Sequence, residues 1–200
     1  MTHKIKVGLT GGIGSGKSVV ARILSSIGIP VYDSDSQAKR LTVEDSIIRE
    51  ELICLLGSTI YENNSLNKQE LATFLFASEA NAQKINGIIH PRVKSDFHSW
   101  VEIQDKQIVA IESAILIEAG FSSDVDFIIA VYAPKEVRIQ RTMDRDSLSR
   151  EDVESRLSNQ LDDEDKKKLA DFVVINDGIE PLIPQIDTLL RVLNKELHKD

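Results

Sequence analysis

Residues 11–18 read Gly-Gly-Ile-Gly-Ser-Gly-Lys-Ser, and this stretch decides the fold. It fits the phosphate-binding pattern G-x-x-x-x-G-K-[ST] at every fixed position. Its glycines let backbone N–H groups close on phosphate oxygens without a Cβ in the way. Lys17 can place a positive charge on the β- and γ-phosphates, and the Ser18 hydroxyl can bind magnesium. The stretch therefore predicts a nucleoside triphosphate site.

The segments on either side of the loop support this interpretation. Residues 5–10 have the pattern of a short strand, and residues 18–24 have the pattern of the start of a helix. A helix N-terminus aimed at the loop adds its dipole to anion binding. A chance glycine-rich turn, the alternative, would not account for both flanks.

The composition bounds the class of protein. The chain has 200 residues, 42% hydrophobic and 28% charged, which is typical of one soluble globular domain. A net charge of -8 argues against general binding of nucleic acid or an anionic membrane, so a polyanionic ligand needs a local cationic site. A single cysteine, Cys54, excludes an intramolecular disulfide, and we expect it to pack in an apolar helix. There is no signal-peptide pattern and no long apolar run, so the cytoplasm is the expected compartment.

Short apolar runs alternate with longer periodic stretches, which predicts an α/β fold with helices on both sides of a parallel sheet. We expect five strands, at residues 5–10, 30–32, 108–112, 126–132 and 171–175. The last three are almost continuously apolar, as strands buried on both faces are. Helices are expected at residues 36–41, 44–56, 68–76 and 79–104, and Pro91 should kink or split the last of them.

These elements predict a single P-loop kinase domain over residues 1–200, with three parts. The core, a three-layer α/β/α sandwich, takes residues 1–35, 107–137 and 169–200. Residues 36–106 are too long for an ordinary crossover and predict a helical substrate-binding subdomain. Residues 138–168 are highly charged and helical in period, which fits either a solvated helix pair or a mobile lid.

Missing motifs direct the prediction towards kinases. A GTPase is expected to carry Asp-x-x-Gly after a strand, and no aspartate of this chain lies three residues before a glycine. The most similar string to a guanine motif, Asn67-Lys68-Gln69-Glu70, has glutamate in place of aspartate. A triphosphate site without these motifs leaves a small-molecule kinase as the leading hypothesis.

Two aspartates stand where a kinase needs an acceptor carboxylate. Asp33 and Asp35 follow the predicted strand at residues 30–32, and ligands of open α/β sheets bind outside the carboxyl ends of the strands. Asp33 can therefore orient or deprotonate the attacking hydroxyl. Capping of the next helix is the alternative for Asp33, and capping or contact with magnesium or substrate remain equal alternatives for Asp35.

Arginines supply the opposing charge. Arg141 and Arg145 lie four residues apart on one predicted helix face, and a guanidinium suits bidentate contact with phosphate. Neighbouring acidic residues, Asp144, Asp146 and Glu151, leave surface ion pairs as an equal alternative.

With these features the chain resembles the dephospho-coenzyme A kinase family over almost its whole length. The segments that carry the resemblance are 8–18 (Gly-Leu-Thr-Gly-Gly-Ile-Gly-Ser-Gly-Lys-Ser), 33–35 (Asp-Ser-Asp), 89–92 (Ile-His-Pro-Arg), 141–146 (Arg-Thr-Met-Asp-Arg-Asp), 156–160 (Arg-Leu-Ser-Asn-Gln) and 170–178 (Ala-Asp-Phe-Val-Val-Ile-Asn-Asp-Gly). Residues 114–118 depart from the family's usual Pro-Leu-Leu-Phe-Glu, and Glu112 stands where aspartate is common. The resemblance therefore does not define the shape of the substrate wall near residues 112–118.

The resemblance implies that ATP, with magnesium, phosphorylates the ribose 3′-hydroxyl of dephospho-coenzyme A. By this resemblance Asp33 is the base, with Lys17 and Arg141 also catalytic. Magnesium falls to Ser18, and the acceptor substrate to Asp33, Asp35, His90 and Arg92, although His90 could equally serve only the helix around Pro91. The nucleotide would be held by Gly12, Ile13, Gly14, Ser15, Gly16, Lys17, Ser18, Val19, Arg145 and Asn176.

Two other functions are also compatible with the sequence. One is another P-loop kinase acting on a nucleoside, a sugar acid or shikimate, and the other is a nucleotide-binding regulatory module. No nucleic acid or membrane partner is expected, and the sequence does not decide between a monomer and a homo-oligomer.

Overall fold

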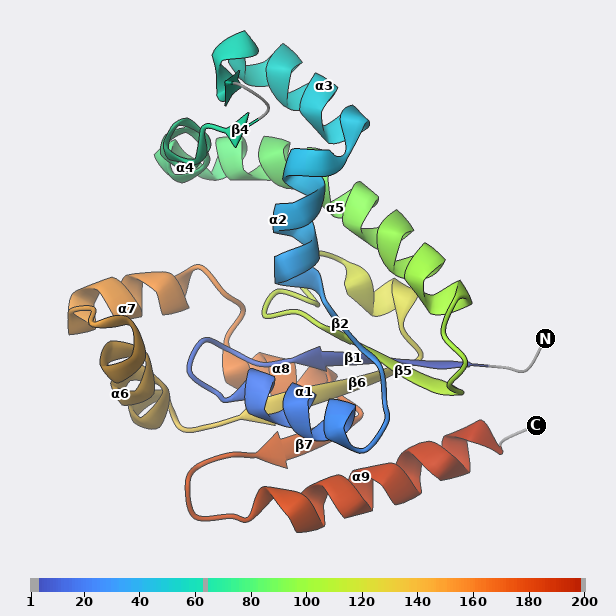
Figure 1. Cartoon of the computed structure of the whole chain (residues 1–200). Helices are drawn as coiled ribbons and strands as arrows, with labels where there is room; N and C mark the ends of the chain where they lie inside the picture. The colour runs from blue at the N-terminus through green and yellow to red at the C-terminus, as the bar shows by residue number, and fades with distance from the viewer. Residues whose placement is uncertain (1–3, 63–64, 199–200) are drawn as a thin grey trace. The chain divides into compact units, whose positions relative to one another are not determined.

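The chain, in a computed structural model that describes residues 4–62 and 65–198, divides into two compact units (Figure 1). Unit 1 is built from Met1–Tyr32 and Ile103–Asp200, and unit 2 from Asp33–Glu102. In Figure 1 the chain leaves unit 1 through β2 and returns to it through β5. Each unit has buried side chains of its own.

Unit 1 is organised around a five-stranded parallel sheet with the strand order β2-β5-β1-β6-β7. The strands are β1 (Ile5–Thr10), β2 (Val31–Asp33), β5 (Ile108–Glu112), β6 (Phe127–Tyr132) and β7 (Phe172–Ile175). At the centre of the sheet, Val7 of β1 lies opposite Ala110 on one side and Phe127 on the other. The five predicted parallel strands are confirmed, because their apolar runs are long enough to be read without tertiary information.

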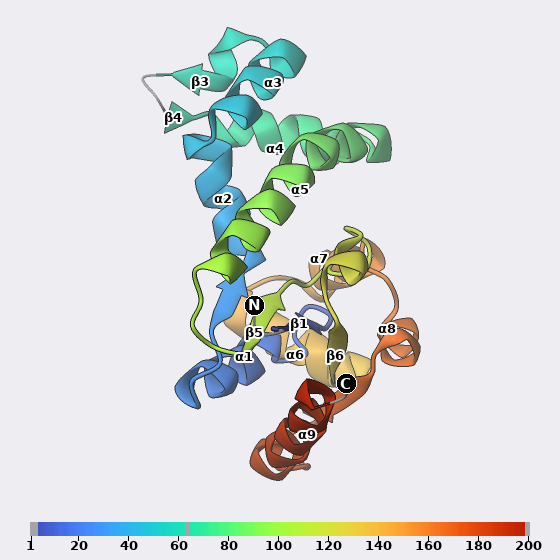
Figure 2. The same cartoon turned by 90° about the vertical axis from the view of Figure 1, so that its right-hand side faces the viewer.

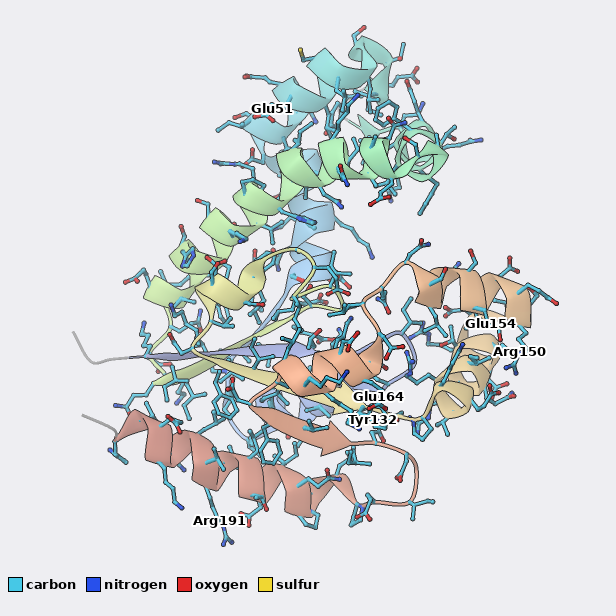
Figure 3. All side chains as sticks on the ribbon, turned by 180° about the vertical axis from the view of Figure 1, so that it is seen from behind. Glu51, Tyr132, Arg150, Glu154, Glu164 and Arg191 are labelled. Carbon is cyan, nitrogen blue, oxygen red and sulfur yellow. The ribbon has the colours of Figure 1, made fainter. Side chains whose placement is uncertain are left out.

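Helices cover both faces of this sheet. Helices α1 (Lys17–Ser26) and α9 (Leu182–Leu197) share one buried cluster with alternate residues of β1 and β6. Gly8 points to the other face, where an added Cβ would lie 2.8 Å from the side chain of Leu116. On that face Tyr132 of β6 lies beside Glu164 of helix α8 (Asp163–Leu169), as Figure 3 shows. This gives the three predicted layers.

The charged stretch from Arg138 to Lys168 holds three helices rather than the expected pair. They are α6 (Lys135–Asp146), α7 (Arg150–Ser158) and α8. Ser147 ends α6 in the left-handed conformation with φ 54°. The Ser149 side chain then caps α7, and the Asp162 side chain caps α8. These caps divide a segment whose periodicity alone suggested fewer breaks.

Unit 2 is mainly helical. It contains α2 (Ser34–Glu44), α3 (Ser46–Leu56), α4 (Lys68–Ala77) and α5 (Glu79–Glu102), together with the antiparallel pair β3 (Tyr61–Glu62) and β4 (Ser65–Leu66), seen in Figure 2. Its fully buried side chains come from several of these elements and include Ile48, Leu52, Ile60, Ile85 and Phe97. The β3–β4 pair was not predicted, because strands of two residues carry no readable alternation.

Two expectations for unit 2 are affected by the structure. Pro91 does not split its helix, since α5 runs unbroken from Glu79 to Glu102, and the alternative of a kink at Pro91 stays a prediction. Ile85 and Val93 are buried on either side of the proline, and their packing outweighs the one backbone hydrogen bond that proline removes. Cys54 is exposed rather than packed, because it lies two residues past the buried Leu52 and off the apolar stripe of α3.

None of the helices within residues 4–62 and 65–198 combines the length and the apolar character that a membrane span requires.

Candidate active site

The phosphate loop joins the end of β1 at Thr10 to the start of α1 at Lys17. Gly14 has φ 80° and Gly16 has φ 87°, a region that glycine enters without steric cost. The Ser15 N–H donates to the Gly12 carbonyl at 3.0 Å, which closes the loop on itself. The first N–H groups of a helix have no partner within the helix, so the start of α1 offers donors and a positive dipole to an anion.

Position 14 needs a glycine because of its φ and because the surrounding atoms leave no room for a Cβ. A Cβ there would lie 2.3 Å from the Arg138 carbonyl oxygen. We expect Gly14→Ala to lower the free energy of unfolding by about 3 kcal/mol, from left-handed strain plus overpacking. Gly28→Ala is the matched control, because Gly28 has φ 89° but no heavy atom within 4 Å of the added Cβ, so about 1 kcal/mol is expected. Urea titration of both variants checks this, and equal losses would contradict it.

Lys17 is held by a carboxylate on the neighbouring strand. Its Nζ donates to Glu112 Oε1 at 2.5 Å, and both side chains are only 12% exposed. Glu112 is the last residue of β5 and lies opposite Leu9 of β1. The carboxyl-end rule that singled out Asp33 applies equally to Glu112, which the sequence analysis noted only as a departure from the family pattern.

Arg141 and Asn176 are brought to the loop by a chain of two hydrogen bonds. The Asn176 side-chain amide donates to the Ser15 carbonyl at 2.8 Å, and Arg141 Nη1 donates to the Asn176 carbonyl at 2.8 Å. An added Cβ on Gly16 would lie 2.0 Å from Asn176 Nδ2, so the amide packs directly on the loop. The structure thus gathers Arg141, Asn176 and the loop in unit 1.

Arg145 lies in a different environment from Arg141. Its Nε and Nη2 donate to the two carboxylate oxygens of Asp146 at 2.7 and 3.0 Å, and its side chain is 63% exposed. Asp146 also lies 3.5 Å from Arg156. Arg145 therefore makes the surface pair described as its alternative, and its role at the nucleotide stays a prediction.

Asp33 caps a helix in the structure. It is the last residue of β2, and its Oδ1 accepts the N–H groups of Asp35 and Ser36 at 3.1 Å each. Its Oδ2 accepts the Ser36 hydroxyl at 2.6 Å. These three donors fix the carboxylate at the start of α2, where Asp35 is exposed in the first turn. Asp33 thus has the capping role, and its catalytic role stays a prediction.

Arg92 makes an ion pair inside unit 2. Its Nε and Nη2 donate to Asp45 Oδ2 at 3.0 and 2.7 Å, while Asp45 Oδ1 caps α3 through the Ile48 N–H. Burial works to raise the pKa of the Asp45 carboxyl, but Arg92 and the Ile48 N–H outweigh it and lower that pKa. Arg92 thus links α5 to the start of α3, and its contact with substrate stays a prediction.

His90, two residues before Arg92, is partly buried in α5. Burial, and then the positive charge of Lys94, lower the pKa of the His90 imidazole below its ordinary value. The neutral ring is therefore favoured in the folded state.

This pKa predicts a pH dependence of stability. The unfolded chain takes up the His90 proton near pH 6.5, before the folded protein does, so the free energy of unfolding falls as the pH drops below that value. We expect His90→Gln to make this fall shallower between pH 7.5 and 5.5. Urea titrations at intervals across that range measure it, and parallel slopes for parent and variant would rule the assignment out.

A cavity in unit 2 lies apart from the predicted substrate residues. Its volume is about 700 Å³, and neither Asp35, His90 nor Arg92 lines it. Its walls come from α3, α4 and the residues before α4, namely Leu55, Leu56, Asn67, Gln69, Glu70, Thr73, Phe74 and Ala77. None of these residues belongs to a motif that predicts a binding site, so this cavity could not be predicted from the sequence.

A family model, a named relative and a crystal structure are each similar to most of the chain. A family model described as dephospho-CoA kinase matches residues 5–181. A dephospho-CoA kinase of Bacteroides fragilis is 50% identical over 195 residues, which are 97% of this chain and 95% of the relative. The crystal structure of TT1252 from Thermus thermophilus has a TM-score of 0.82 at 31% identity and covers 98% of this chain and 100% of that one.

A shikimate kinase from Acinetobacter baumannii, solved with shikimate, is also similar in structure. Its TM-score is 0.58 at 17% identity, with 99% of this chain and 97% of that chain covered. At this identity the likeness shows the fold alone. Together with the parallel sheet, it confirms the predicted P-loop kinase fold.

Proposed function

The chain belongs to the dephospho-CoA kinase family, and from this premise we propose that it transfers the γ-phosphoryl group of ATP to the ribose 3′-hydroxyl of dephospho-CoA. The products are CoA and ADP, so the reaction is the last step of CoA biosynthesis. The observation that carries the proposal is the extent of the family match, which runs from β1 past the end of β7. It therefore includes the phosphate loop, Asp33 and all three charged helices.

The phosphate loop fits a triphosphate. Gly14 and Gly16 have the left-handed φ that turns N–H groups inwards, and α1 begins directly after them. We assign the loop amides and Lys17 to the β- and γ-phosphates, where a fixed cation and fixed donors stabilise the charge of the transferring group. Glu112 keeps Lys17 in place by its ion pair, and Lys17 would exchange this partner for phosphate oxygens.

Magnesium is assigned to Ser18, in the first turn of α1. Among the described residues no group of three or more His, Cys, Asp and Glu side chains could hold a metal ion by itself. That agrees with a magnesium ion bound mainly through phosphate oxygens and water, as this ion is in kinases. When bound, it would neutralise charge on the β- and γ-phosphate oxygens.

The acceptor hydroxyl is assigned to Asp33. Both β1 and β2 are parallel strands of one sheet, so the loop after β1 and the end of β2 follow carboxyl ends of strands. The Asp35 and Ser36 N–H groups hold the Asp33 carboxylate in one orientation, as a base that positions a hydroxyl requires. We assign Asp35, His90 and Arg92 to the dephospho-CoA substrate, within a helical substrate-binding subdomain of residues 36–106.

Residues 138–168 are proposed as the lid. Arg141 is its catalytic arginine, because the contact with Asn176 already ties it to the loop. Closure of the lid would exclude water, which otherwise competes with the acceptor for the phosphoryl group. Asn176 is assigned to the neighbourhood of the adenine. The cytoplasm stays the proposed compartment.

The leading rival is another P-loop kinase, and shikimate is the acceptor that the structural likeness brings forward. A coupled assay of ADP release distinguishes the candidates. We expect release with dephospho-CoA and only background release with a nucleoside, gluconate or shikimate. ADP release that does not depend on any acceptor would instead support a regulatory nucleotide-binding module.

A further inference from the structure

Two consecutive N–H groups of the phosphate loop are bonded to side chains from outside the loop. The Gly12 N–H donates to Asp163 Oδ1 at 3.1 Å, and the Ile13 N–H donates to Gln160 Oε1 at 3.0 Å. These two donors lie in the first half of the loop and are engaged by the protein itself. The phosphates would then be left to donors in the second half of the loop, apart from the Ser15 N–H, which is bonded to the Gly12 carbonyl.

Asp163 is one member of a buried ion pair. Its Oδ2 lies 2.8 Å from Arg138 Nε, and the two side chains are 6% and 9% exposed. Burial raises the pKa of the Asp163 carboxyl, while Arg138, Lys166 and the Gly12 N–H act in the opposite direction. We call Arg138, Gln160 and Asp163 the loop brace.

The loop brace packs directly against the loop backbone. A Cβ on Gly12 would lie 2.4 Å from Arg138 Nη1 and 2.6 Å from Asp163 Oδ1. Only glycine leaves room for this approach, so Gly12, at a variable position of the pattern, has a use beyond phosphate contact. Within the pair, Asp163 contacts the loop at the Gly12 N–H.

The helix that carries Asp163 is attached to the segment that follows β5. Lys166, 1% exposed, donates to the Ala114 carbonyl at 2.7 Å and lies 3.0 Å from Glu118 Oε1. Glu118 also accepts the Leu161 N–H at 2.8 Å. Asp163 therefore reaches the loop from an anchored end of residues 138–168, and the closure proposed for this segment would fall to the part between Arg138 and Gln160.

The opposite charges of Arg138 and Asp163 compensate each other beside the phosphate loop. A lone carboxylate beside a triphosphate site would repel the ligand, and in a buried place this repulsion is screened little. The Arg138 guanidinium makes the pair neutral overall. The carboxylate can then accept a charge-assisted hydrogen bond from the Gly12 N–H without weakening phosphate binding.

We propose that Asp163, paired with Arg138, is a positioning residue that sets the first half of the phosphate loop for nucleotide binding. The inference rests on the proposed function only in that the nucleotide is ATP. It assigns Asp163 no contact with substrate. Asp163 acts through Gly12, and Arg138 acts through Asp163.

Removal of the acceptor is the first test. We expect Asp163→Ala to weaken ATP binding roughly tenfold, measured by calorimetric titration, because the buried Gly12 N–H loses its partner. We expect kcat to stay within about threefold of the parent at saturating ATP, since no reacting group is lost. Asp165→Ala is the matched control on the same helix, where an exposed carboxylate pairs with exposed Lys168.

Charge compensation is the second test. Arg138→Gln leaves the buried carboxylate uncompensated, so we expect it to weaken ATP binding by about tenfold or more. Adding Asp163→Asn to Arg138→Gln removes that charge and keeps an oxygen acceptor for Gly12. The double variant should therefore bind ATP at least about threefold more tightly than Arg138→Gln alone.

Two results would overturn the proposal. One is folded Asp163→Ala with the parent's affinity for ATP. The other is a double variant that binds ATP no better than Arg138→Gln, and this comparison decides the matter even where Asp163→Ala fails to fold. A merely structural role would lower the melting temperature and the active fraction but leave the affinity of the folded protein unchanged. Because ATP titration needs no acceptor, a parent that binds ATP but leaves dephospho-CoA unphosphorylated refutes the proposed function alone.

Discussion

Lys17→Ala lowers the rate of phosphoryl transfer by at least ~10³-fold in a protein that still folds. Lys17 supplies the fixed cation of the phosphate loop, and no flexible surface lysine can replace a charge held in place by Glu112. The measurement is ADP release with dephospho-CoA, together with circular dichroism and a urea titration of the variant.

Two variants control this result. Lys17→Ala leaves Glu112 without its partner, so Lys17→Ala with Glu112→Gln separates lost catalysis from an unpaired carboxylate. Lys6→Ala removes a lysine of β1 whose Nζ lies 3.8 Å from the carboxylate of Asp126 at the surface. This variant should keep the parent's rate. A normal rate for Lys17→Ala would refute the assignment of the loop.

Asp33→Asn lowers turnover by ~10²–10⁴-fold and leaves ATP binding unchanged. The structure makes this substitution a clean one, because Asp33 caps α2 and asparagine is as good a cap as aspartate. The carboxylate charge is lost while the helix start is kept. Steady-state turnover and calorimetric titration with ATP measure the two halves of the prediction.

Further substitutions at the same position separate capping from catalysis. Asp33→Ser also caps a helix, so it should lose turnover as fully as Asp33→Asn while keeping the parent's stability. Asp33→Ala should lose about 1 kcal/mol of stability in addition. Turnover of Asp33→Asn within about threefold of the parent would show that Asp33 is a cap and nothing more.

The residues that could be predicted are those whose signal lies within a short window of sequence. The phosphate loop can be recognised from the spacing of its residues. The strands β5, β6 and β7 can be recognised from apolar runs, which are typical of a sheet buried on both faces. The ends of all five strands were therefore close to correct. The same local reasoning failed for β3 and β4, which are too short to show a period.

The contacts that were missed join residues far apart in the chain. Lys17 and Glu112 are 95 positions apart, and Gly12 and Asp163 are 151 apart. No periodicity reports such pairs, because they exist only once β1, β5 and α8 are assembled. The aspartate at position 163 looked like one acidic residue of a charged stretch, and only its burial distinguishes it from Asp165.

The acceptor is the part of the account that depends most on family membership. The loop predicts where phosphates bind, and a similar sheet occurs in a shikimate kinase. Neither feature therefore identifies the hydroxyl that is phosphorylated. The position of the new phosphate therefore shows which hydroxyl the protein phosphorylates.

That measurement is a phosphorus NMR spectrum of the product formed from ATP and dephospho-CoA. We predict a new monoester on the ribose 3′-hydroxyl, with the diphosphate bridge of the substrate intact and one ADP formed for each acceptor consumed. A phosphate on another hydroxyl, or ADP formed while dephospho-CoA remains unchanged, would contradict the account.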